Sequence, residues 1–214
     1  HLIDSADVKE DVLHGIDAGL TKQVARERLT EADKAAILGR ITVTDDLHQL
    51  HDCDLVIESV VEDMEVKRDL FEKLDRIVKP DAIIATNTST LAVVELAMVT
   101  ERPDKVCGIH FFNPAPMMKL VEVIRPLTAS DETIDAAVEF ATTCGKDAVQ
   151  VQDRAGFIVN ALLFPYLNNA IRMWEQGTAS MDDIDTAMMG GCNFPMGPFA
   201  LLDLVGLDTS LAIL

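Results

Sequence analysis

Basic residues are scarce in this sequence. The 214 residues include 18 Lys and Arg against 36 Asp and Glu, so the formal net charge is −18. Nucleic-acid binding depends on Lys and Arg to neutralise phosphates, and an anionic membrane surface would repel the excess of carboxylates. The charge balance argues against a nucleic acid or a membrane as partner, and we expect a small molecule or another protein instead.

Signals for export, membrane insertion and metal binding are also missing. No apolar run approaches the ~20 residues that span a bilayer, and residues 1–4 lack the basic and apolar regions of a signal peptide. The cysteines form no C-x-x-C pair and have no histidine at metal-ligand spacing. We interpret them as reduced, mostly buried small hydrophobes, and we expect no metal and a cytoplasmic location. They are Cys53, Cys107, Cys144 and Cys192.

Aromatic residues make up only 5% of the chain, but hydrophobic residues in total reach 49%, which is enough to build a substantial core. Up to about residue 151, short apolar runs alternate with segments of helical periodicity. This alternation is typical of parallel strands with helices on both faces. Strands are expected at 41–43, 54–58, 82–85, 105–110, 120–124 and 148–151, after the end of a strand at 1–4. Helices are expected at 6–29, from Thr30 onwards, and at 63–78, 91–98 and 131–144.

The alternation stops after Gly156, where only helical segments follow, at 157–175, 181–189 and 199–204. We therefore predict an α/β domain over residues 1–152 and an all-helical domain over 153–214, packed against each other. The sequence begins without Met and ends in the apolar residues 211–214. We expect the first domain to be incomplete at its N-terminus and the second at its C-terminus.

Polar residues follow the expected strands. Glu58, residues 87–89 and His110 come at the ends of three of them. In open parallel sheets, ligands bind outside the carboxyl ends of the strands. These positions are therefore the first place to look for a ligand site.

His110 is the only histidine that follows an apolar strand, and Glu122 lies in a run of residues that is otherwise apolar. A buried carboxylate is costly unless it is paired, and an imidazole is a natural partner for it. The alternative is that Glu122 points to water from a surface strand. Alternation along the strand is compatible with both.

Ser89 and Asn160 also have two interpretations each. The Ser89 hydroxyl could bind a ligand, or it could cap the helix expected at 91–98. No G-x-S-x-G turn surrounds it, which argues against a nucleophilic serine. Asn160 lies near the start of an apolar helix, where a ligand or the other domain could supply its hydrogen-bond partners.

Seven motifs in this order closely resemble the L-3-hydroxyacyl-CoA dehydrogenase family, especially its bacterial 3-hydroxybutyryl-CoA dehydrogenase branch. The resemblance covers nearly the whole chain from about residue 40 and is looser before it. The motifs are Asp54–Glu58, Val61–Asp63 with Lys67, Thr86–Ser89, Gly108–Pro116, Lys119–Ile124, Asp153–Asn160 and Pro195–Pro198.

The resemblance implies a Rossmann-type NAD-binding domain with a parallel sheet, followed by a helical domain that forms a homodimer. It implies an enzyme that transfers a hydride between NAD and C3 of a short-chain 3-hydroxyacyl-CoA. His110 would be the catalytic base and Glu122 would orient it and balance its charge. Ser89 and Asn160 would hydrogen-bond the substrate oxygen.

The resemblance also implies binding residues. Glu62, Lys67, Ser89 and Asn113 match positions that contact NAD, and Asp4 resembles the acid that binds the adenosine ribose. Lys22 and Arg26, with Arg28, are candidates for the coenzyme A phosphates. A solvated helix face is an equally good interpretation of these three basic residues.

One part of the family pattern is missing from the 214 residues: the first strand and the G-x-G-x-x-G turn that cradles the pyrophosphate. We therefore expect this stretch alone to bind NAD poorly and to belong to a longer enzyme. Three other identities stay open: a sugar-acid dehydrogenase of the lambda-crystallin type, a non-catalytic NAD-binding relative, and a piece of a multifunctional fatty-acid oxidation protein.

Overall fold

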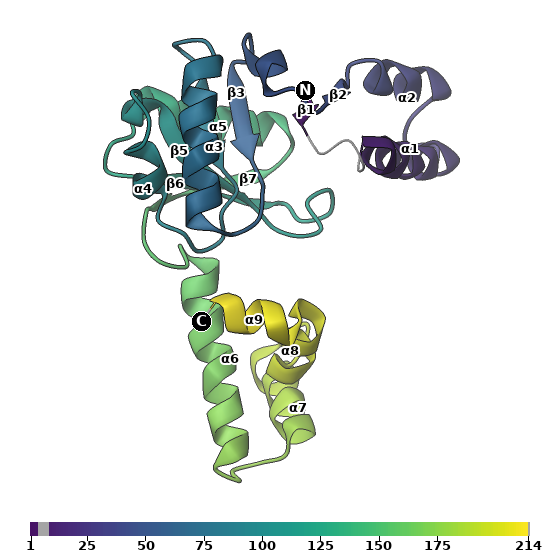
Figure 1. The fold of residues 1–214 in the computed structure, drawn as a ribbon. Coiled ribbons are helices and arrows are strands. Elements are labelled where there is room, and N and C mark those ends of the chain that lie inside the picture. The colour runs from purple at the N-terminus through teal and green to yellow at the C-terminus, as the bar shows by residue number, and fades with distance from the viewer. Residues whose placement is uncertain (4–8, 214) are drawn as a thin grey trace.

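The computed structural model describes residues 1–3 and 9–213, and Figure 1 shows them as an α/β part followed by a group of helices. The main sheet contains β3 (Leu55–Glu58), β4 (Ile83–Thr86), β5 (Val106–Phe111), β6 (Leu120–Arg125) and β7 (Asp147–Gln152), in that spatial order. Its helices are α3 (Met64–Ile77), α4 (Val93–Ala97) and α5 (Asp131–Thr143), with two 3₁₀ turns at Leu47–Leu50 and Pro103–Lys105. The predicted alternation of strands and helices is confirmed.

The sheet is parallel except at one pair of strands. β5 and β6 run antiparallel, with His110 directly opposite Glu122, whereas the other neighbouring pairs are parallel. The uniform parallel arrangement expected from the alternation therefore does not hold between these two strands. The reason is the connection, because residues 112–119 are too few for the crossover of about a dozen residues that parallel neighbours need.

The N-terminal elements form a second, smaller unit. β1 (Leu2–Ile3) pairs in parallel with β2 (Val43–Thr44), and α1 (Lys9–Ala25) and α2 (Glu31–Leu38) connect them. At the start of α2, Thr30 and Asp33 form a reciprocal capping box, as their spacing predicts. Among the described strands, none joins this pair to β3 by hydrogen bonds.

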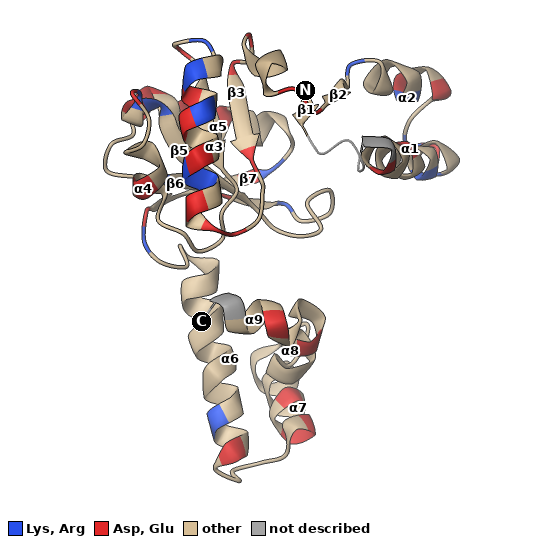
Figure 2. Cartoon of the chain, viewed as in Figure 1, with Lys and Arg blue, Asp and Glu red and all other residues tan. Residues whose placement is uncertain are grey.

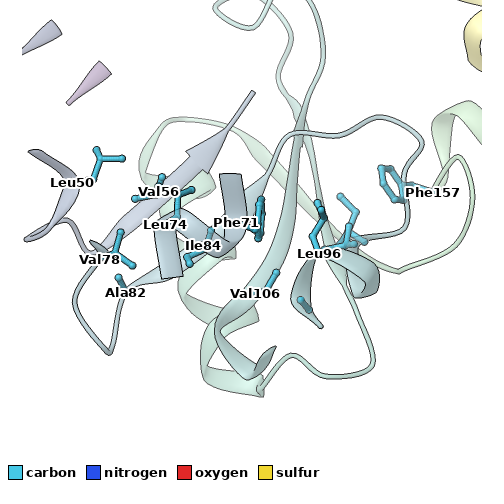
Figure 3. Packing of buried hydrophobic residues seen from close by; sticks show 13 residues of the cluster. Leu50, Val56, Phe71, Leu74, Val78, Ala82, Ile84, Leu96, Val106 and Phe157 are labelled. Carbon is cyan, nitrogen blue, oxygen red and sulfur yellow. The ribbon is translucent and has the colours of Figure 1, made fainter. Parts of the chain in front are cut away.

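Side chains alternate between the two faces of the main sheet. Ile84 and Val106 point towards α3 and α4, where they pack with Phe71 and Leu96 in one core cluster. Figure 3 shows this cluster, with Phe157 at one end of it, on the side of Leu96. Cys107 points to the opposite face and joins the second cluster, beneath α5. The continuous apolar strands of the sequence are thus buried on both faces.

The C-terminal part is helical, as predicted. It consists of α6 (Val159–Glu175), α7 (Met181–Cys192), α8 (Pro198–Val205) and α9 (Leu207–Ile213), of which the sequence did not predict α9. Figure 2 shows that α6 carries charged residues only towards its C-terminal end. Within the described ranges, no helix has the length and apolar character to cross a membrane.

The segment between the two parts is held by side-chain contacts. The Asp153 carboxylate accepts hydrogen bonds from the backbone N–H groups of Val93 and Val94, at 3.1 and 2.7 Å. Phe157 is buried in the core cluster of the α/β part. Gly156 has a positive φ of 71°, and a Cβ there would lie 2.8 Å from the backbone nitrogen of Ala161. The domain boundary predicted after residue 152 therefore lies next to a segment that is packed against the α/β part.

All four cysteines are free thiols, but the expectation that most of them are buried is wrong. Cys107 is buried and Cys53 is partly exposed, whereas Cys144 and Cys192 lie at the surface. Cys144 directly follows α5 and Cys192 is the last residue of α7, and at neither position is a small residue required to face the core. Burial raises the pKa of the Cys107 thiol to about 12.

These environments predict how the thiols react with DTNB, because the thiolate is the reactive species. Cys144 and Cys192 should react within the mixing phase in the native protein, and Cys107 only after unfolding. A Cys144→Ser/Cys192→Ser double variant should lose the fast phase. Rapid reaction of Cys107 in the native protein would contradict its placement in the core.

Candidate active site

The carboxyl ends of β3, β4 and β5 meet at one edge of the sheet, and Asn87 ties them together. Its side-chain N–H donates to the Ser59 hydroxyl at 3.0 Å, and its oxygen accepts from the backbone N–H of Phe111 at 2.8 Å. Ser59 follows β3, Asn87 follows β4 and Phe111 ends β5. The residues after Asn87 and before Phe111 are thereby held at a common edge.

His110 and Glu122 form a buried pair across β5 and β6. Their Nδ1 and Oε2 atoms lie 2.8 Å apart, and the residues are only 4% and 1% exposed. Directly opposite residues of an antiparallel pair project to the same face of the sheet. The alternative that Glu122 points to water is wrong, because the start of α6 covers this face.

The second oxygen of Glu122 caps α6. Oε1 accepts hydrogen bonds from the backbone N–H groups of Ile158 and Val159, both at 3.0 Å. Ile158 is the N-cap of α6, and its own side chain makes no capping bond. The positive end of the helix dipole therefore faces the carboxylate.

Three groups oppose the effect of burial on Glu122. Burial by itself would raise the pKa of this carboxyl, but the hydrogen bonds from His110, Val159 and Ile158 outweigh it and hold the pKa below its usual value. Glu122 is thus kept as a carboxylate beside the imidazole.

The pair leaves one nitrogen of His110 available for chemistry. When Nδ1–H donates to Glu122, Nε2 is the unprotonated nitrogen and can accept a proton. The ring contacts Phe112 and Phe157, with centroid distances of 4.6 and 5.7 Å. Nothing in the described part of the chain hydrogen-bonds Nε2. The arrangement suits general acid–base chemistry.

Ser89 and Asn160 meet next to this edge. The Asn160 side-chain N–H donates to the backbone carbonyl of Ser89 at 3.3 Å, which joins α6 to the turn after β4. Ser89 does not cap the following helix, because α4 begins at Val93 and Asp153 binds its first N–H groups. The helix-cap interpretation is therefore wrong. Among the described residues, the Ser89 hydroxyl has no hydrogen-bond partner.

Glu62 and Lys67 are brought together with the same turn. The Lys67 ammonium lies 3.2 Å from Glu62 Oε2, and Glu62 Oε1 accepts the backbone N–H of Ser89 at 2.9 Å. Burial would raise the pKa of Glu62, but the hydrogen bonds from Thr88 and Ser89 and the charge of Lys67 keep it below its usual value. Glu62, Lys67 and Ser89 thus form one connected group.

The remaining predicted binding residues are not joined to this group by any contact among the described residues. Asn113 is exposed in the loop after β5. Lys22 and Arg26 are exposed at the C-terminal end of α1, in the smaller unit that Figure 1 shows beside the main sheet. Asp4 lies outside the described residues.

The sequence did not predict the roles of three contributors. Asn87 lies at one of the expected strand ends and Asp153 lies in one of the seven motifs, but only their contacts show that they position strand ends and α4. Glu58 was noted at the end of a strand, and its burial against Lys67 was not predicted. For Glu58, the signal was an acid at the end of an apolar strand followed by a lysine on an amphipathic helix.

Comparison with known proteins identifies the family. A family model described as the 3-hydroxyacyl-CoA dehydrogenase NAD-binding domain matches residues 1–154, and the model of the C-terminal domain of the same enzymes matches 156–214. The chain is 48% identical to a 3-hydroxybutyryl-CoA dehydrogenase of Clostridioides difficile over 93% of its own length and 71% of that protein. It is 46% identical to the mitochondrial hydroxyacyl-coenzyme A dehydrogenase of Rattus norvegicus, over 100% of this chain and 71% of that protein.

A solved structure agrees with these matches. The crystal structure of (S)-3-hydroxybutyryl-CoA dehydrogenase from Ralstonia eutropha superposes with a TM-score of 0.95 at 41% identity, covering 98% of this chain and 74% of that one. The fold and site therefore define an NAD-dependent oxidoreductase with a Rossmann-type domain and a helical domain. The chain belongs to the 3-hydroxyacyl-CoA dehydrogenase family.

The lowered pKa of Glu122 predicts how a Glu122→Gln variant responds to pH. The variant should be less stable by about 1–3 kcal/mol at pH 7, because the carboxylate loses its bonds to His110 and to α6. A carboxyl with a depressed pKa stabilises fully above its unfolded value of about 4.3, and this contribution disappears as the pH falls through the folded value. The difference between wild type and variant should therefore shrink below about pH 4.

Urea unfolding at pH 7 and at steps down to pH 3 measures this difference. Glu139→Gln, at an exposed position of α5, serves as the control and should change stability little at any pH. A difference for Glu122→Gln that stays constant across the range would show that the carboxylate is not the stabilising form.

Proposed function

We propose that this protein catalyses the reversible, NAD-dependent oxidation of the 3-hydroxyl of a short-chain 3-hydroxyacyl-CoA, such as 3-hydroxybutyryl-CoA, to the 3-keto form. The observation that carries the proposal is the buried His110–Glu122 pair at the carboxyl edge of the sheet, with Ser89 and Asn160 beside that edge. A secondary alcohol can lose hydride from carbon only when a base takes the hydroxyl proton. The pair supplies that base.

His110 takes the proton of the 3-hydroxyl on Nε2 and becomes an imidazolium. Glu122 stabilises this cation through Nδ1–H and holds the ring in one tautomer, which is the role of an acidic partner in acid–base catalysis. In the reductive direction, the same imidazolium returns its proton to the developing alkoxide. The Ser89 hydroxyl and the Asn160 amide hydrogen-bond the substrate oxygen in both directions.

The residues present fit NAD at the edge where parallel strands end. Glu62 and Ser89 sit at that edge, and Asn113 follows β5 with its side chain exposed. Lys67 contributes through Glu62, and Asp4 would bind the ribose hydroxyls. When bound, NAD accepts the hydride from C3 or returns it.

The substrate's coenzyme A would extend towards basic residues. Lys22 and Arg26 are exposed near the end of α1. Their side chains are free to form charge-assisted hydrogen bonds with the coenzyme A phosphates. Basic side chains that could bind phosphate are few in this chain, because Asp and Glu outnumber Lys and Arg two to one.

The helical part carries the surface that we expect to form a homodimer. Leu162, Leu204 and Leu211 are 71%, 71% and 76% exposed, and an apolar cavity of about 720 Å³ lies between α6 and α8. Apolar surface of this kind on a globular protein marks a contact site. The free thiols suit a reducing compartment such as the cytoplasm.

The activity is tested by following NADH oxidation at 340 nm in the full-length protein with acetoacetyl-CoA, and with NADPH in parallel. We expect turnover with NADH and little with NADPH. Turnover with a sugar acid and NAD, but none with acetoacetyl-CoA, would instead identify the protein as a sugar-acid dehydrogenase of the lambda-crystallin type. No turnover with any of these in folded protein would indicate a non-catalytic relative.

His110→Gln tests the proposed base. We expect kcat to fall by about 10²–10⁴-fold, the usual contribution of a general base, while NADH still binds. His48→Gln, at an exposed position of the 3₁₀ turn Leu47–Leu50, is the matched control and should keep wild-type kcat. A loss of less than about tenfold in His110→Gln would rule out the role of base.

Leu204→Asp tests the dimer. A charge on this exposed leucine should weaken an apolar interface, so the molar mass measured by light scattering should fall from dimer to monomer at micromolar protein. Leu127→Asp is the control, because Leu127 is 94% exposed on the α/β part. A monomeric wild type would contradict the dimer. A Leu204→Asp variant that remains dimeric would show that the interface does not depend on Leu204.

A further inference from the structure

Lys67 lies in an unusual place for a lysine. It projects from α3 into the protein with 1% exposure. Its ammonium lies 2.6 Å from Glu58 Oε1, 3.2 Å from Glu62 Oε2 and 3.4 Å from the carbonyl oxygen of Val60. These three acceptors match the three protons of the ammonium. The side chain is therefore engaged within the protein.

Glu58 is the deeper of its two acidic partners. Its side chain is fully buried at the end of β3, and Oε1 also accepts the backbone N–H of Val60 at 2.7 Å. One oxygen thus fixes both the loop after β3 and the position of Lys67. The other oxygen, Oε2, is buried and has no partner among the described residues.

Glu62 transmits this arrangement to the turn after β4. Its Oε2 faces Lys67, while its Oε1 accepts the backbone N–H groups of Ser89 and Thr90 at 2.9 and 3.3 Å. The hydroxyl of Thr88 donates to the same oxygen. Glu62 therefore binds the backbone amides of this turn, while Asn160 binds the Ser89 carbonyl, and Lys67 pairs with the Glu62 carboxylate.

We propose that Glu58 is a positioning residue of the active site, which acts through Lys67 and Glu62 to fix the 88–90 turn and its Ser89 hydroxyl. Without Glu58, Lys67 would keep only one carboxylate, and the half-exposed Glu62 would have no fixed cation to direct it. The kinetic part of the proposal rests on the proposed function, whereas the part that concerns the turn does not.

A second ion pair on α3 shows what a merely structural pair looks like. Asp75 is 9% exposed in its side chain, contacts Arg102 at 2.6 Å and accepts the backbone N–H of Glu101 at 2.9 Å. None of these residues contacts the 88–90 turn. Asp75→Asn therefore removes the carboxylate of another largely buried ion pair that involves α3, and it serves as the matched control.

Hydrogen exchange of the Ser89 amide, followed by NMR in the full-length protein, tests the turn without any reference to activity. In Glu58→Gln the amide should exchange at least tenfold faster, because Glu62 no longer holds it. The amides of Val93 and Val94, which Asp153 binds, should keep their rates. Wild-type exchange of Ser89 in folded Glu58→Gln would overturn the proposal, as would equal acceleration in Asp75→Asn.

Steady-state kinetics tests the consequence for the reaction. Displacement of a group at the reacting centre by about 1 Å costs up to 10²-fold in rate, so Glu58→Gln should lower kcat by about one to two orders of magnitude. Glu58→Asp, which keeps the charge, should recover part of this loss, and Asp75→Asn should leave kcat unchanged. A loose turn with unchanged kcat would overturn the kinetic part alone. An inactive wild type with the expected exchange would instead count against the proposed function.

Discussion

One carboxylate holds the edge of the proposed active site together. Glu122 divides its two oxygens between the His110 imidazole and the first N–H groups of α6, and it does so at 1% exposure. A buried carboxylate needs partners for both oxygens. Here one partner is the His110 imidazole, which we propose as the base, and the other is the start of the helical part, so neither can move far without the other.

This sharing explains why the segment before α6 is so tightly packed. Asp153 binds the start of α4, Phe157 enters the core of the α/β part, and Asn160 reaches back to Ser89. All three residues come from one short stretch of chain. The stretch therefore sets the orientation of α6 relative to the sheet, and Glu122 links the start of α6 to His110.

The sequence predicted the order of elements well, because each depends on local signals. Apolar runs bounded by acids marked β3, and the spacing of Thr30 and Asp33 marked the start of α2. α9 was missed because its seven residues are too few to show a clear helical periodicity. Its position depends on packing against α8, which no periodicity reveals.

The sequence offered the His110–Glu122 pair as one of two interpretations of Glu122, and only the structure shows that the two side chains are bonded. Alternation along β6 assigns Glu122 to one face of the sheet, but it does not say what covers that face. The answer depends on α6, which begins more than thirty residues later in the chain. Lys67 posed the same difficulty, because a lysine on an amphipathic helix is normally exposed and only the buried Glu58 accounts for its place.

The reversal of one strand completes the geometry. In a parallel pair, His110 near the end of β5 would lie beside a residue near the end of its neighbour. Because β6 runs antiparallel, the end of β5 instead faces the beginning of β6. Glu122 therefore lies at the edge where open α/β sheets bind their ligands. Gly108 permits the close approach, since a Cβ there would lie 2.8 Å from the Ile124 side chain. The short connection over residues 112–119, which excludes a parallel crossover, is thus what places His110 and Glu122 together.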